Sequence, residues 1–235
     1  DRWKTKAIDS RECSLTNKTE IAENEKEYGE DSDWFRVWVR GLPPRASDLQ
    51  FIDSKTVWDA QRRDVHVLPD EPLVLGIDVA RGGEDWNVLR FRRGLDARTI
   101  PPVRIAGGEV RDSMLLITKI CDVIEKHKPK AVFLDATGGS IGGPIGDRIR
   151  QLGFKVIDVQ FGGKSPDAHY ADHRSWMWSK MRDWLEKGAI EKDYRLEIDL
   201  GGPTAGHNKR DRMILESKEA MLTDQRLGKR RFADS

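Results

Sequence analysis

The most constraining feature of the sequence is the stretch LVLGIDVARGGEDWNVLRFRR, residues 73–93. It consists of an apolar run with a single acidic residue, Asp78, followed by a glycine turn and a second apolar run. This pattern predicts two strands, Leu73–Ala80 and Trp86–Arg92, joined as a hairpin. Burying an unpaired charge is costly, so we expect the Asp78 carboxyl to be protonated, salt-bridged or bound to a cation.

The chain after residue 100 alternates between short apolar runs and helical patterns. These patterns predict strands at 103–106, 131–134 and 156–161 and helices at 113–127, 145–152 and 174–187. Strands joined through a helix run parallel, whereas strands joined by a hairpin run antiparallel. We therefore predict an α/β fold with a mixed sheet, antiparallel in its first strands, parallel in its later helix-linked strands, and flanked by helices.

The N-terminal part of the chain has a different pattern. Residues 1–33 are polar and too poor in periodic apolar positions to build a core by themselves. The alternation of apolar residues in Trp34–Arg40 (WFRVWVR) predicts a strand. The segment LPDEP, residues 68–72, is typical of a linker. We therefore expect a first domain at residues 1–70 and a second at 71–235.

The composition is that of an ordinary globular protein, with 37% hydrophobic residues, 34% charged residues and a net charge of +1. This net charge does not point to nucleic acid, so DNA binding would require a local basic face. Because there is no apolar run of about 18 residues and no apolar leader, we expect neither a membrane span nor a signal peptide. The distant cysteines, Cys13 and Cys121, are typical of reduced thiols in the cytoplasm.

A basic segment closes the chain, because lysine and arginine outnumber the acids from residue 203 onward. The candidate DNA-contacting residues are Lys209, Arg210, Arg212, Lys229, Arg230 and Arg231. Contacts from such residues to phosphates are independent of base sequence and sensitive to salt. The alternative is a solvated or disordered end.

Two aspartates occupy comparable places in the predicted sheet. Asp78 lies in the first strand, and Asp135 lies at the end of a later, helix-linked strand. If these strands are parallel neighbours, both carboxylates approach one point near the carboxyl ends of the strands. Such oxygen clusters suit Mg²⁺ or Mn²⁺, and two ions about 4 Å apart can promote phosphodiester hydrolysis. The alternative is that Asp78 pairs with an arginine and Asp135 caps the following turn.

Four sequence blocks in this order resemble the C-terminal nuclease domain of phage large terminase subunits: GIDVARGGEDWNVL, VFLDATGG, DHRSWMWSKMRDWLEKGAI and MILESKEAM. Upstream, EYGEDSDWFRVWVRGLPP resembles the end of the terminase ATPase domain. The resemblance implies a ribonuclease H-like fold in which Asp78 and Asp135 take the places of the first two metal-binding acids. Asp85 matches a commonly acidic position near that site.

The sequence departs from the terminase pattern in two places. The family's third metal-binding acid follows the ESKE block in a proline-aspartate context, whereas this chain has Asp234 in RFADS. The third acid is therefore either Asp234 or a residue beyond Ser235. The chain also has no GxxxxGK[ST] phosphate loop, so it is not the ATPase motor by itself.

Four further residues near these blocks are weaker candidates. Glu216 and Lys218 lie in the ESKE block, where the lysine would neutralise a phosphate; the alternative is a solvated ion pair. His169 and His173 flank a loop before a predicted helix. A terminase-like site can recruit a histidine; the alternative is that they have no chemical role, as is usual for exposed loop histidines.

The resemblance implies a metal-dependent endonuclease that cuts double-stranded DNA during phage or prophage genome packaging. It implies Mg²⁺ or Mn²⁺ as the cofactor, the host cytoplasm as the location, and the portal and the small terminase subunit as further partners, without a membrane. One alternative is a cleavage-deficient nuclease-fold fragment that binds DNA or a portal-type partner. Another is a different ribonuclease H-like enzyme, such as a resolvase or recombinase.

Overall fold

The computed structural model describes residues 8–30, 33–42, 50–68, 70–80, 85–109, 112–137, 141–217, 219–221 and 223. Its helices are α1 (Lys18–Tyr28), α2 (Asp33–Trp38), α3 (Ser54–Arg62), the 3-10 helix η1 (Gly107–Glu109), α4 (Ser113–His127), α5 (Gly142–Gln151), α6 (His173–Leu185) and α7 (Tyr194–Gly201). Its strands are β1 (Leu73–Asp78), β2 (Trp86–Arg93), β3 (Asp96–Ala97), β4 (Val103–Ala106), β5 (Ala131–Asp135), β6 (Ile157–Val159), β7 (Ala189–Ile190), β8 (Ala205–His207) and β9 (Met213–Leu215).

The chain divides into two compact units. The first comprises residues 1–59, 192–206 and 215–234, and the second comprises residues 60–191, 207–214 and 235. The sequence predicted a first domain at 1–70 and a second at 71–235. The expected ranges stay a prediction about domain organisation. Within the described residues, no helix is both long and apolar enough to cross a membrane.

The second unit is built on a seven-stranded mixed sheet. Its strands follow the order β6-β5-β1-β2-β3-β7, and β4 also pairs with β2. Strand β1 pairs antiparallel with β2 and parallel with β5, and β5 pairs parallel with β6. The predicted fold class is therefore confirmed, including the antiparallel first strands and the helix-linked parallel strands.

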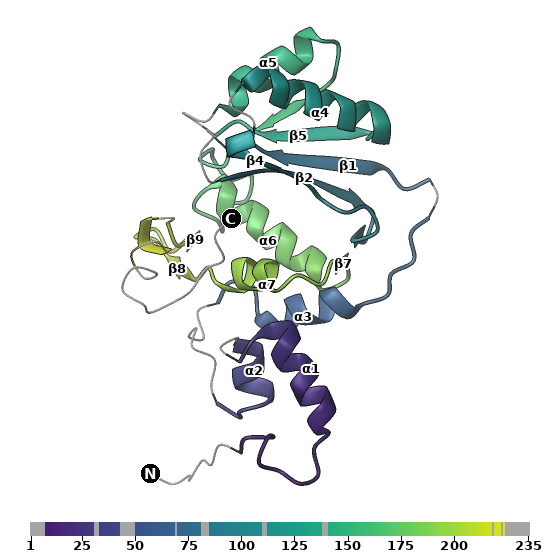
Figure 1. Cartoon of the computed structure of the whole chain (residues 1–235). Helices are drawn as coiled ribbons and strands as arrows, with labels where there is room; N and C mark the ends of the chain where they lie inside the picture. Colours follow the sequence, from purple (N-terminus) through teal and green to yellow (C-terminus); the bar gives the residue numbers. More distant parts are fainter. Residues whose placement is uncertain are drawn as a thin grey trace. The chain divides into compact units, whose positions relative to one another are not determined.

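Alternation along β1 decides which face of the sheet is buried. Leu73, Leu75 and Ile77 are buried in one apolar core, together with residues of α4 and α5 such as Ile120 and Ile149. Figure 1 shows α4 and α5 together over the part of the sheet that contains β5 and β1. Burial of each such side chain contributes about 1.5–3 kcal/mol, so the register of β1 is firmly set.

The helices of this unit begin where local capping allows. The Asp112 carboxylate accepts a hydrogen bond from the Met114 N–H at 2.8 Å and so caps the N-terminus of α4. Helix α6 lies on the opposite face of the sheet, because Arg92, whose neighbour Phe91 points into the core, stacks on the Trp184 ring at 5.8 Å.

The predicted strand at Trp34–Arg40 is wrong, because this segment forms helix α2 and the turn after it. Phe35 and Val39 are buried and pack with Ile21, Trp58 and Tyr194 in the core of the first unit. Phe35 and Val39 are four residues apart, so they share one face of the helix. Trp38 lies off that face and is exposed. In so short a segment the same apolar residues fit both periods, and packing selects the helix.

Candidate metal centre

The register of the parallel strands brings Asp78 and Asp135 together. Val74 to Ile77 of β1 pair in order with Ala131 to Leu134 of β5. One further step along both strands sets Asp78 beside Asp135, where neighbouring strands are about 4.8 Å apart. Side chains alternate between faces, so the two carboxylates share the face opposite α4 and α5.

The two carboxylates differ from the expectation of a buried charge. Ile77 and Leu134, the preceding residues, point into the core, whereas Asp78 is exposed and Asp135 is half-buried. The cost of burial that motivated the first prediction for Asp78 therefore does not apply. The reason to expect a cation here is the proximity of a second carboxylate, which repels the first unless a positive charge lies between them.

Thr137 holds one oxygen of the Asp135 carboxylate. The Thr137 N–H and hydroxyl both donate to Asp135 Oδ1, at 2.8 Å and 2.5 Å. The predicted alternative, in which Asp135 caps the following turn, is thus realised, but it uses a single oxygen. In the described part of the chain, no residue donates to Oδ2 of Asp135. Turn capping and cation binding are therefore compatible.

Gly142 allows helix α5 to begin against the backbone of Asp135. A Cβ atom on Gly142 would overlap the carbonyl oxygen of Asp135 and approach the Cα atom of Ala136. A Cβ atom on the next residue, Gly143, would meet nothing within 4 Å. Only the first of these two glycines is required by close approach, and it fixes the backbone that carries Asp135.

The third acid of the predicted site lies outside the described residues. Asp234, Lys218, Lys229, Arg230 and Arg231 all belong to this undescribed group. Among the residues that the structure describes, no group of three or more His, Cys, Asp or Glu side chains is placed to hold a metal ion. The roles of Asp234 and of the four basic residues outside the described part of the chain stay predictions.

Asp85 lies immediately before β2, and its side chain is exposed. Its backbone carbonyl accepts a hydrogen bond from the Gly107 N–H at 2.8 Å, which fastens the start of β2 to the end of β4. Its predicted place near the metal site stays a prediction.

The Glu216 carboxylate has a local structural partner. Its Oε2 atom accepts hydrogen bonds from the Thr204 N–H at 2.9 Å and from the Thr204 hydroxyl at 2.6 Å. These bonds lie within the first unit, whereas Asp78 and Asp135 belong to the second. The role predicted for Glu216 near the metal site stays a prediction.

Three of the predicted DNA-contacting residues lie in or beside the turn between β8 and β9. Lys209 and Arg210 are exposed, and Arg212 is half-buried. The Asn208 side chain accepts hydrogen bonds from the backbone N–H groups of Arg210 and Arg212, at 2.9 Å and 3.1 Å. The turn therefore has a defined backbone that presents basic side chains.

The described contacts of the two loop histidines, His169 and His173, are with residues other than Asp78 and Asp135. His169 Nδ1 lies 2.9 Å from Asp167 Oδ1, and the His169 backbone N–H and ring hold the pKa of the Asp167 carboxyl below its ordinary value. His173 Nδ1 lies 2.8 Å from the carbonyl oxygen of Gln160, and its ring stacks on Trp176. Both contacts stabilise the loop and the start of α6.

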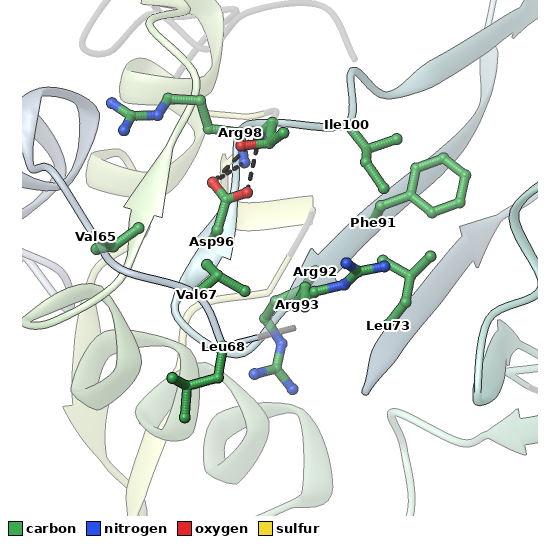
Figure 2. Close-up of a pocket in the computed structure, with 11 residues that line it drawn as sticks. Val65, Val67, Leu68, Leu73, Phe91, Arg92, Arg93, Asp96, Arg98 and Ile100 are labelled. Carbon is green, nitrogen blue, oxygen red and sulfur yellow. Dashed lines mark hydrogen bonds between the residues drawn. The ribbon is translucent and has the colours of Figure 1, made fainter. Parts of the chain in front are cut away.

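A pocket of about 270 Å³ lies at the other end of β1. Figure 2 shows Leu73, Phe91 and Ile100 along one wall and Asp96 with Arg98 across from them. Leu73 is five residues from Asp78, roughly 16 Å along a strand, so this pocket is separate from the pair of carboxylates. No sequence signal marked it, because its lining comes from several short segments.

Solved structures of terminase nucleases are similar to this chain. The nuclease domain of the large terminase subunit gp2 of bacterial virus Sf6, a point mutant solved with manganese and beta-thujaplicinol, matches with a TM-score of 0.54 and 14% identity, over 78% of this chain and 93% of that one. A point mutant of that subunit solved with calcium matches with a TM-score of 0.56 and 13% identity, over 75% and 91%. The large terminase nuclease of thermophilic phage G20c with bound magnesium gives 0.47 and 11%, over 77% and 93%.

No protein-family model matches the chain, and no curated protein matches it in sequence. The structural matches to the Sf6 domain cover most of both chains, at a sequence identity that shows the fold alone. This protein has the ribonuclease H-like fold of phage large terminase nuclease domains, as the four sequence blocks predicted.

Proposed function

We propose that this chain is the nuclease part of a phage or prophage large terminase, a metal-dependent endonuclease that cuts double-stranded DNA during genome packaging in the host cytoplasm. The observation that carries the proposal is the parallel register of β1 and β5, which sets Asp78 beside Asp135 on one face of the sheet. This pair occurs in a fold shared with the Sf6 nuclease domain, which was solved with manganese.

The donor set suits a hard divalent cation. Carboxylate oxygens are the preferred protein ligands of Mg²⁺ and Mn²⁺, which also keep several waters. Asp78 and Asp135 would hold the cation, and Asp234 or a residue after Ser235 would complete the site. When bound, Mg²⁺ or Mn²⁺ supplies Lewis-acid chemistry for hydrolysis of a phosphodiester. The protein's part is to fix the two carboxylates and to position the DNA.

The basic turn at residues 208–212 is the best candidate for positioning DNA. Lys209 and Arg210 are exposed there, so their side-chain N–H donors are accessible from solvent. Phosphate oxygens would satisfy such donors without reading the base sequence. Lys229, Arg230 and Arg231 would extend this basic surface. The portal and the small terminase subunit are further proposed partners.

Plasmid cleavage tests this function. We expect the purified chain with Mn²⁺ to nick or linearise plasmid DNA, and we expect Asp78→Ala to lose cleavage while its circular dichroism spectrum stays unchanged. Intact plasmid with this chain, and also with a longer form that contains the residues after Ser235, would contradict the proposal.

A second candidate function is DNA binding without cleavage. The specific observation in its favour is that the β1–β5 register brings two acids together, whereas the described residues contain no group of three His, Cys, Asp or Glu side chains placed to hold a metal ion. Calorimetry with Mn²⁺ separates the two candidates, because a complete site binds the cation tightly, whereas a site with two carboxylates binds weakly or not at all.

A further inference from the structure

One oxygen of Asp135 has its hydrogen-bonding capacity filled by a single residue. Asp135 Oδ1 accepts from the Thr137 N–H at 2.8 Å and from the Thr137 hydroxyl at 2.5 Å. A carboxylate oxygen has about two lone-pair sites, so both sites of Oδ1 are used. Oδ2 is the oxygen to which no described residue donates, and it is therefore the one offered to a ligand.

A hydrogen bond from the Phe161 backbone fixes the direction of the Thr137 hydroxyl. The Phe161 N–H donates to Thr137 Oγ1 at 3.2 Å, so an oxygen lone pair faces Phe161 and the hydroxyl proton points to Asp135. The same loop is fastened to β6 by the hydrogen bond from the Ala136 N–H to the Val159 carbonyl, at 3.0 Å. The Gln160 side chain adds a hydrogen bond to the Ala136 carbonyl, at 2.6 Å. Thr137 therefore acts as a clamp on Asp135 Oδ1, and the backbone of Phe161, two residues after β6, holds the clamp in place.

Divalent cations differ in how they use a carboxylate. Mg²⁺ requires nearly octahedral oxygen ligands at about 2.0–2.1 Å, and Mn²⁺ also prefers an octahedral set of oxygens. Ca²⁺ takes 6–8 oxygens at about 2.3–2.6 Å and readily binds both oxygens of one carboxylate. A carboxylate with one oxygen occupied by two hydrogen bonds is a single-oxygen ligand, which suits the first two ions better than the third.

We propose that Thr137 determines cation specificity: by clamping Oδ1, it makes Asp135 bind through Oδ2 alone and thereby favours Mn²⁺ or Mg²⁺ over Ca²⁺. This proposal rests on the proposed function, in which Asp135 is a metal ligand. Thr137 is a positioning residue, since it acts through Asp135 and does not touch the cation.

The test is calorimetric titration of the full chain with MnCl₂ and with CaCl₂, in three variants. Thr137→Val removes the hydroxyl and keeps the branched shape and the N–H, so the ratio of Mn²⁺ to Ca²⁺ affinity should fall roughly threefold to tenfold, the net contribution of one typical hydrogen bond. Thr137→Ser restores the hydroxyl and should restore the ratio. Thr118→Val removes a hydroxyl that donates to the Met114 carbonyl in α4, and it should leave the ratio unchanged.

Two results would overturn the proposed role of Thr137 and leave the proposed metal site standing. One is an unchanged ratio in Thr137→Val, and the other is an equal loss of affinity for both ions, which indicates a general structural defect. Asp135→Asn tests the underlying site, because it should abolish binding of both ions. If Asp135→Asn binds as the wild type does, or if the wild type binds neither ion, the metal site and the clamp fail together.

Discussion

The two ends of β1 belong to one strand, yet their charged groups are used in opposite ways. At the carboxyl end, Asp78 and Asp135 lie on neighbouring parallel strands, and no residue in the described part of the chain donates to Asp135 Oδ2. At the amino end, Asp96 is more deeply buried, and both of its oxygens accept hydrogen bonds from backbone N–H groups of Arg98 and Thr99. Burial of an acid therefore does not identify a site; unused acceptor capacity beside a second acid does.

The arginines reinforce the contrast. Arg92, Arg93 and Arg98 line the pocket at the amino end, where Arg92 is engaged by the Gly94 carbonyl and the Trp184 ring. At the carboxyl end of β1, two acids lie where neighbouring parallel strands end. Ligand sites in open α/β sheets commonly lie at this position. We therefore expect chemistry at one end of β1 and structural roles at the other.

The largest expected effect is a difference in plasmid cleavage between variants at the two ends of β1. Asp135→Asn should lower plasmid cleavage in Mn²⁺ by more than about a hundredfold, because a ligand of the proposed cation is lost. Arg93→Gln, at the pocket end, should cleave within about twofold of the wild type. Initial rates on supercoiled plasmid measure both variants, and equal losses would erase the distinction between the two ends.

A smaller effect is expected where α5 begins against Asp135. Gly142→Ala should lower the free energy of unfolding by about 1–3 kcal/mol, because its Cβ would overlap the Asp135 backbone. Its neighbour supplies the matched control, since Gly143→Ala adds a methyl group in open space and should change stability by less than about 1 kcal/mol. Urea unfolding compares them; equal stabilities would show that the close approach does not matter.

The third prediction concerns the acid at the pocket end. Asp96→Ala removes the acceptor of the Arg98 and Thr99 N–H groups and should cost about 1–3 kcal/mol of stability, while Mn²⁺ affinity stays unchanged. Asp122→Ala, at an exposed position of α4, should change stability by less than about 0.5 kcal/mol. Thermal unfolding and calorimetry provide the readouts, and weaker Mn²⁺ binding in Asp96→Ala would argue against separate roles.

Much of the sheet was predictable because its signals are local and repeated. Alternation in residues 73–93 assigned β1 and β2, and the helix at α4 made β5 parallel to β1. The two-residue strands β3 and β7 were missed, because two residues carry no periodicity. The segment at α2 was assigned the wrong period, because Phe35 and Val39 fit one face of either element.

The candidate site was predictable in its two acids but not in their supports. Asp78 and Asp135 follow from strand position, whereas the overlap that requires Gly142 depends on packing between distant segments. The hydrogen bonds from Thr137 to Asp135 could have been predicted from the sequence. A threonine two residues after an aspartate at a strand end is a local hydrogen-bonding pattern. Asp234 lies outside the described residues, so the third ligand stays a prediction.

The most direct test of the central claim is an anomalous difference map from crystals of this protein grown with Mn²⁺. The pairing of β1 with β5 predicts a manganese peak between the carboxylates of Asp78 and Asp135, with Asp135 Oδ2 as the coordinating oxygen. A well-ordered site without a peak there, or a peak only at the arginine-lined pocket or elsewhere, would contradict the account.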